Sequence, residues 1–173
     1  EALIRLRFII PKEYEEFSEI LYKKNALIFN NNPSKISFVI APSLDCNMSC
    51  IYCFEKGYRS KKVMDKEVII QTIEFIKKIA NQSDSLKVLN VTWFGGEPCL
   101  QKDIIFTISK ELISFSSKRN IKYTSKIVTN GLLMNRELTQ KFVDYCGIKH
   151  AQITIDGLAE TYARNKCTDV NAF

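Results

Sequence analysis

Apolar residues recur with two different periods along the chain after Pro33. A period of two predicts strands over 36–41, 86–94, 122–129 and 148–155. A spacing of three or four predicts helices over 65–80, 103–118 and 135–146 between those strands. This alternation favours a parallel sheet with its helices packed outside, either an open doubly wound sheet or part of a β/α barrel.

The first 33 residues follow a separate pattern. A helix is predicted over 12–25, with Tyr14, Phe17 and Leu21 on one face, and Pro11 favours its start. Short strands are expected on either side of it, the second over 26–29, and the asparagine-rich segment 30–34 reads as a turn. We therefore expect residues 1–33 to form a strand–helix–strand extension and residues 34–173 to form the α/β domain.

Polar segments follow each of the four predicted strands. Because the carboxyl ends of parallel strands meet at one edge, where such folds bind ligands, we expect these segments to form a single site. The segments are Asp45–Cys53, Gly95–Pro98, Thr129–Gly131 and Asp156–Gly157.

Composition and charge narrow the possible functions. The 173 residues are 46% hydrophobic, which is enough for a core, and no apolar run is long enough to span a membrane. The start of the sequence lacks a signal-peptide layout, which favours a cytoplasmic location. The net charge of +6 permits an acidic peptide, an anionic cofactor or nucleic acid as partner, but a solvated basic surface is favoured over nucleic-acid binding. The single histidine, His150, excludes mechanisms that need two.

Cysteine spacing is the strongest chemical signal. Cys46, Cys50 and Cys53 fall within eight residues, and without a secretion signal they are expected to be thiols or metal ligands. Three thiolates without a fourth ligand nearby favour a [4Fe–4S] cluster with one open iron. The alternative is zinc, which would take its fourth ligand from one of the remaining cysteines. These are Cys99, Cys146 and Cys167.

Two further segments can contact a ligand. Gly95 and Gly96 allow close approach to the backbone, and Glu97 offers a carboxylate for an ammonium group, unless the segment is an ordinary turn. Tyr52, between two of the cysteines, can border a planar base or fill the mouth of a barrel.

The end of the fourth predicted strand is polar on one face. Gln152, Thr154 and Asp156 alternate there and are interpreted as an inward face of a buried strand, which binds hydroxyl groups or forms a core network. Thr129 and Asn130, after the third strand, are also predicted to contact a ligand, but the sequence supports this less strongly because Asn130-Gly131 is also typical of a turn.

Taken together, the three-cysteine motif, Gly95-Gly96-Glu97-Pro98 and the segment 152–157 resemble the radical S-adenosylmethionine superfamily, and within it the SPASM-type peptide and sulfatase maturases. The resemblance covers residues 34–173 and implies a partial TIM-type (β/α) barrel. It implies that the three cysteines hold a [4Fe–4S] cluster whose open iron chelates S-adenosylmethionine. It implies that Gly95–Glu97 contacts the amino group of S-adenosylmethionine and that Tyr52 borders its adenine. It also implies that Gln152, Thr154 and Asp156 contact the ribose and carboxylate region of the same molecule.

The implied activity is reductive cleavage of S-adenosylmethionine to a 5′-deoxyadenosyl radical that modifies a peptide or protein side chain. A reduced flavodoxin or ferredoxin is the implied electron donor. Alternatives are a radical enzyme acting on RNA and a non-catalytic, metal-stabilised binding module. The family carries six barrel strands and a C-terminal domain with auxiliary clusters, so we expect the barrel here to be truncated after its fourth strand, with the SPASM-type domain outside this chain.

Overall fold

The computed structural model describes residues 17–18, 21 and 33–168. The chain divides into two units, 1–32 and 33–173, and the fold described below is that of the second. The predicted N-terminal strands, and the helix over 12–25 apart from three of its residues, lie outside the described part of the chain.

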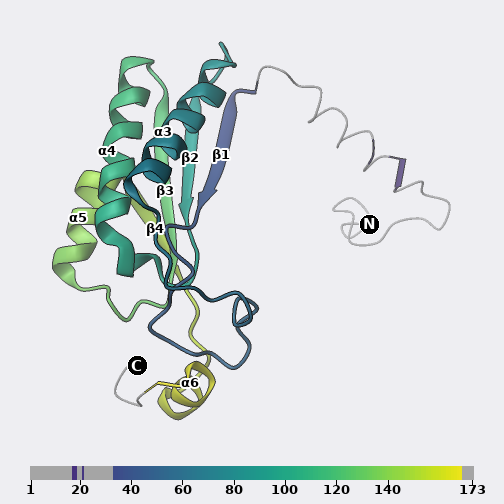
Figure 1. Cartoon of the computed structure of the whole chain (residues 1–173), viewed down its shortest axis with the longest axis vertical. Helices are drawn as coiled ribbons and strands as arrows, with labels where there is room; N and C mark the ends of the chain where they lie inside the picture. The colour runs from purple at the N-terminus through teal and green to yellow at the C-terminus, as the bar shows by residue number, and fades with distance from the viewer. Residues whose placement is uncertain (1–16, 19–20, 22–32, 169–173) are drawn as a thin grey trace, which may run out of the picture. The chain divides into compact units, whose positions relative to one another are not determined.

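Four parallel strands form one sheet in sequence order, and helices connect them (Figure 1). The strands are β1 (Lys35–Ile40), β2 (Val88–Trp93), β3 (Lys122–Thr129) and β4 (Ile148–Ile153). The connecting helices are α3 (Lys66–Asn81), the short 3₁₀ helix η1 (Pro98–Gln101), α4 (Lys102–Lys118) and α5 (Arg136–Cys146), and α6 (Ala159–Lys166) follows β4.

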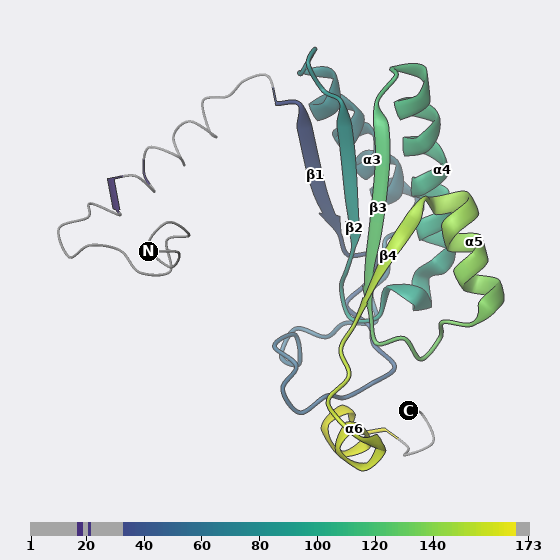
Figure 2. The ribbon, with the colours of Figure 1, turned by 180° about the vertical axis from the view of Figure 1, so that it is seen from behind.

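Helices α3, α4 and α5 all cover the same face of the sheet (Figures 1 and 2). A doubly wound sheet carries helices on both faces, whereas a β/α barrel carries them only outside. The prediction of a partial barrel with parallel strands and outer helices is therefore confirmed.

Local sequence signals set the helix ends. The side chain of Asp65 accepts a hydrogen bond from the backbone N–H of Val68 and caps α3, and Asn135 caps α5 through Leu138 in the same way. Gly147 ends α5 at a φ of 61°, a left-handed conformation that glycine adopts without strain.

The core lies between the sheet and these three helices. Fully buried apolar side chains of β2 meet those of α4 there, and this burial supplies the main stabilisation of the unit. They include Leu89, Val91, Trp93, Ile105, Ile108 and Leu112. None of the helices in the described part of the chain is long and apolar enough to cross a membrane.

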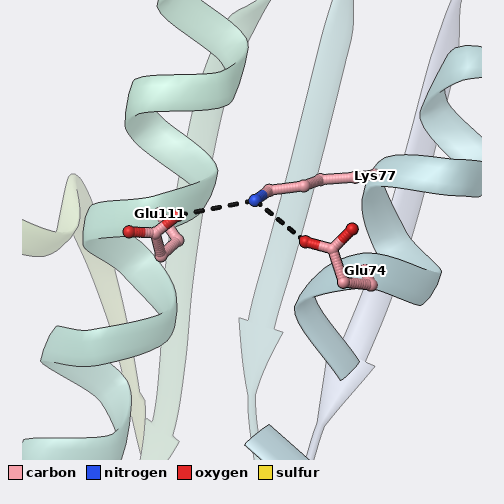
Figure 3. A network of polar contacts seen from close by, with 3 residues as sticks. All are labelled: Glu74, Lys77 and Glu111. Carbon is pink, nitrogen blue, oxygen red and sulfur yellow. Dashed lines mark hydrogen bonds and ion pairs between the residues drawn. The ribbon is translucent and has the colours of Figure 1, made fainter. Parts of the chain in front are cut away.

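A three-residue polar contact joins α3 to α4 on the outer surface (Figure 3). The Lys77 ammonium lies 3.2 Å from Glu74 on its own helix and 3.4 Å from Glu111 on α4. Burial lowers the pKa of Lys77, but the two carboxylates more than offset this and raise it. Both carboxylates are half exposed or more, so we expect the contact to contribute about 1 kcal/mol or less.

Two features of the C-terminal part differ from the sequence-based expectation. The strand predicted over 148–155 ends at Ile153, and β4 lies at the edge of the four described strands with its residues after Ile148 exposed, so its interpretation as a buried strand stays a prediction. Segment 159–166, for which we predicted no helix, forms α6 beyond the carboxyl ends of the strands (Figure 2). Its short polar sequence carries little apolar periodicity, which is the signal that helix prediction needs.

Candidate functional site

A cavity of about 200 Å³ opens at the carboxyl ends of the strands. Nine of the twelve residues predicted for the site line it, which agrees with the expectation that the polar segments meet at one edge. The nine are Cys46, Cys50, Tyr52, Cys53, Gly95, Gly96, Thr129, Asn130 and Thr154. Glu97, Gln152 and Asp156 do not line it.

The loop that carries the cysteines is organised by its own polar side chains. The Ser43 hydroxyl donates to the Lys62 carbonyl at 2.9 Å and accepts from the Asp45 N–H, which joins the two ends of the loop. The Asp45 carboxylate in turn accepts from the Cys46 N–H at 3.0 Å. The first cysteine is therefore held against the end of β1 before the loop turns outward.

Gly95 and Gly96 are required by close packing against this loop. A Cβ on Gly95, which has a φ of +114°, would lie 2.4 Å from the Ser43 carbonyl oxygen, and a Cβ on Gly96 would lie 2.2 Å from that of Asp45. The N–H groups of Gly96 and Glu97 donate to these same two carbonyls. The glycines thus let two backbone segments touch, and their predicted contact with a ligand remains a prediction.

Glu97 is buried and its carboxylate is already engaged within the chain. Oε1 accepts from the Cys99 N–H at 2.9 Å and from the Thr129 hydroxyl at 2.6 Å, and Oε2 accepts from the Asn130 N–H at 2.7 Å. Only 1% of the residue is exposed. The carboxylate therefore joins the segment after β2 to the end of β3, while its predicted contact with an ammonium group stays untested.

Tyr52 and Asp156 contact each other. The Tyr52 hydroxyl donates to the Asp156 carboxylate at 2.6 Å, and the Lys166 ammonium of α6 lies 3.7 Å from the same oxygen. The ammonium also lies 5.3 Å from the centre of the Tyr52 ring. Burial and the hydrogen bond to Asp156 raise the pKa of Tyr52, against the opposing effect of Lys166.

Asn130 and Gln152 occupy different surroundings. The Asn130 amide donates to the Asn47 side chain at 2.8 Å and lies 3.9 Å from the Cys46 sulfur, so it borders the cysteine loop directly. Gln152 is exposed on β4 and does not line the cavity. Its predicted role in ligand binding is not tested by this geometry.

All three loop cysteines are half-buried free thiols that line the cavity. Burial raises the pKa of Cys50, Lys166 opposes this, and the neighbouring Cys46 and Cys53 raise it further, which places the three sulfurs within electrostatic reach of one another. Within the described residues, no group of three or more His, Cys, Asp or Glu side chains converges as it would around one metal ion.

The positions of the three thiols distinguish a single zinc ion from a [4Fe–4S] cluster. Around a single zinc ion, thiolate sulfurs lie about 3.8 Å apart, as follows from tetrahedral bonds of about 2.3 Å. In a cubane cluster each thiolate binds a different iron, so its ligands stay further apart around a larger volume. Cys99 and Cys146 are buried, Cys167 is exposed, and none of the three lines the cavity, so none completes a zinc site with the three loop cysteines. The three sulfurs around a shared cavity fit a cluster.

Arg59 and Lys166 line the cavity as well, and both are absent from the predicted site. The Arg59 Nε is buried without a hydrogen-bond partner, which leaves a donor available for an acceptor in the cavity. The Lys166 side chain is only 5% exposed. No local spacing marks either residue, because each reaches the cavity through tertiary contacts.

Comparison with known proteins identifies the class. Residues 40–169 match the Radical SAM superfamily, and the chain belongs to this family. The resemblance drawn from the cysteine, glycine and β4 motifs is thereby confirmed.

Individual relatives match only in part. A probable GTP 3′,8-cyclase of Methanococcus maripaludis is 30% identical over 70% of this chain and 37% of its own length. A PqqA peptide cyclase of Bradyrhizobium diazoefficiens is 29% identical over 68% of this chain and 28% of its own length. The solved structure of native anSMEcpe with bound AdoMet and Cp18Cys peptide is 26% identical, with a TM-score of 0.58 over 76% of this chain and 34% of that one. The chain thus spans only 28% to 37% of the length of these relatives.

Proposed function

We propose that this chain forms the cluster-binding and S-adenosylmethionine-binding part of a radical enzyme that modifies a peptide or protein side chain. The observation that carries the proposal is the single cavity in which Cys46, Cys50 and Cys53 meet the segments that follow the other three strands. Those segments are contributed by Gly95-Gly96, Thr129-Asn130 and Thr154.

In this proposal the residues of the chain have separable tasks. The three thiolates hold the [4Fe–4S] cluster, and Asn130 orients the loop of the first cysteine through Asn47. Tyr52 and Thr154 both line the cavity and would contact the adenosine part of S-adenosylmethionine. When bound, the cluster supplies the electron that cleaves S-adenosylmethionine to a 5′-deoxyadenosyl radical. A reduced flavodoxin or ferredoxin is the proposed electron donor.

Relatives support a peptide substrate. The anSMEcpe structure contains a peptide beside AdoMet, and the Bradyrhizobium relative is described as a peptide cyclase. A nucleotide is the second candidate, since GTP 3′,8-cyclases of Methanococcus and Clostridium are 30% to 31% identical to this chain.

An anaerobic assay tests the proposal. The protein is reconstituted with iron and sulfide, reduced with dithionite, supplied with S-adenosylmethionine, and analysed for 5′-deoxyadenosine by liquid chromatography. We expect product from the wild type, none from Cys50→Ala, and wild-type amounts from Cys167→Ala, which removes an exposed thiol outside the cavity.

Each other result has a defined meaning. Bound cluster without any 5′-deoxyadenosine would favour the non-catalytic module, and zinc bound in place of a reconstituted cluster would overturn the radical enzyme. If the product forms, its rate is then compared with GTP and with a synthetic peptide present. If GTP increases the rate of 5′-deoxyadenosine formation and the peptide does not, the substrate is the nucleotide and the peptide proposal is wrong.

A further inference from the structure

Arg59 lies beside the three cysteines although it follows the last of them by six positions. It lines the same cavity, because segment 54–59 folds back over the loop. Its Nη1 donates to the Met48 carbonyl and lies 3.4 Å from the Ser49 hydroxyl, between the first and second cysteines. The guanidinium is therefore fixed against the backbone that presents Cys46 and Cys50.

The charge of Arg59 is not balanced by a carboxylate in the part of the chain that the structure describes. Within the described residues no Asp or Glu forms an ion pair with Arg59, whereas the other cation at the cavity, Lys166, lies beside Asp156. Glu55 also lines the cavity without forming an ion pair with Arg59, and the groups that act on the guanidinium charge are the three thiols. Burial lowers the pKa of Arg59, but a hydrogen-bonding contact with Cys53 and the charges of all three cysteines outweigh this and raise it.

The Arg59 Nε has no hydrogen-bond acceptor among the described residues. It is buried, and leaving a buried donor unpaired is unfavourable because the donor has lost its water and gained nothing in exchange. A sulfur acceptor in the cavity would remove that cost. A guanidinium presents several N–H groups in a fixed plane, so it can bind the loop backbone with one and a second acceptor with another.

We propose that Arg59 balances the negative charge of the cluster bound by the three cysteines and donates a hydrogen bond from Nε to one of its sulfur atoms, which raises the reduction potential of the cluster. The proposal rests on the proposed function, since it needs a cluster at these cysteines. Reduction adds one electron from the external reductant and neither forms nor breaks a bond at Arg59.

The expected direction follows from electrostatics. The reduced cluster carries one more negative charge than the oxidised cluster, so a nearby cation stabilises the reduced state more. Net charge and hydrogen bonds to the sulfurs are the main means by which a protein sets cluster potentials. Arg59 should have a larger effect than Lys166, because Asp156 already offsets the charge of Lys166.

A redox titration tests the proposal with a readout other than turnover. Wild type, Arg59→Gln, Arg59→Lys and Lys61→Gln are reconstituted anaerobically, and the reduced cluster is followed by electron paramagnetic resonance as the potential is lowered. Lys61→Gln is the matched control, since it removes an exposed positive charge two positions away that does not line the cavity. Arg59→Lys keeps the charge and loses Nε.

We expect the potential of Arg59→Gln to shift to more negative values, that of Arg59→Lys to shift less, and that of Lys61→Gln to match the wild type. Equal potentials for Arg59→Gln and wild type would overturn the proposal. If Arg59→Gln fails to bind a cluster, Arg59→Lys decides: a more negative potential supports donation from Nε, and an unchanged one refutes it. A wild type that binds no cluster would instead refute the proposed function.

Discussion

Replacing Glu97 with glutamine gives the sharpest test of how the site is built. The carboxylate accepts from the Cys99 N–H, the Thr129 hydroxyl and the Asn130 N–H, at 2.9, 2.6 and 2.7 Å. Glutamine has nearly the same shape but only one acceptor oxygen. If that oxygen faces Cys99 and Thr129, the amide NH₂ faces the Asn130 N–H, and two donors meet.

The cost can be worked out bond by bond. The two retained hydrogen bonds become weaker by about 1 kcal/mol each, because their acceptor is a neutral amide oxygen in place of a charged carboxylate. The Asn130 N–H loses its acceptor, which costs about 1–3 kcal/mol where water cannot replace it. We therefore expect Glu97→Gln to lower the free energy of unfolding by about 3–5 kcal/mol. For an m-value near 2 kcal/mol/M, this shifts the urea midpoint by about 2 M.

Urea denaturation of the apo protein, followed by circular dichroism, measures this loss. Glu111→Gln is the control, because that carboxylate is half exposed and contacts only Lys77, so its loss should stay below about 1 kcal/mol. A loss below about 1 kcal/mol for Glu97→Gln would show that the three hydrogen bonds to this carboxylate contribute little to stability. Unchanged stability with weaker binding of S-adenosylmethionine would show that the carboxylate serves the ligand instead.

Three further predictions follow from burial and packing. Gly96→Ala places a Cβ 2.2 Å from a backbone oxygen of the cysteine loop, so we expect a loss of about 1–3 kcal/mol in unfolding free energy and lower iron content after reconstitution, measured by urea denaturation and iron analysis. Burial raises the pKa of Cys99 to about 12 and that of Cys146 to about 11, so the unfolded chain releases these protons at lower pH than the folded one. Stability should therefore fall as pH rises from about 9 towards 11, by at most about 1.4 kcal/mol per pH unit for each thiol, and a flat urea midpoint over that range would contradict this. Lys166→Met removes the cation that contacts Asp156 and the Tyr52 ring, so we expect a lower melting temperature and faster proteolysis of the loop that contains Tyr52. Unaltered proteolysis would show that Lys166 does not hold this loop in place.

Local patterns were sufficient for most of the fold. The period-two segment over 122–129 is β3 with the same bounds, and the helices begin at caps that the sequence displays, such as Asp65. The polar segments after the strands could be placed at one edge because all parallel strands end there. The cysteine spacing and the resemblance it carries were likewise available from the sequence alone.

Other features could not be inferred locally. The glycines were interpreted as space for a ligand, yet they also admit the Ser43 and Asp45 carbonyls, a contact between segments about 50 positions apart in the chain. Glu97 was predicted to accept from an ammonium group, which stays untested, and the structure adds that its buried carboxylate accepts from Thr129 and Asn130. The residues next to Glu97 in the sequence give no sign that its hydrogen-bond partners lie at the end of the next strand.

Sequence periodicity determined which residues form strands and helices and which polar groups leave the strands at their carboxyl ends, because these properties depend on neighbours within a few positions. Tertiary structure alone decided which side chains complete the cavity. Tyr52 meets Asp156 across 104 positions, and Lys166 arrives on α6 to join them. Arg59 reaches the cysteines only because its loop folds back. Charge compensation in a buried site depends on such distances in space, which spacing along the chain does not encode.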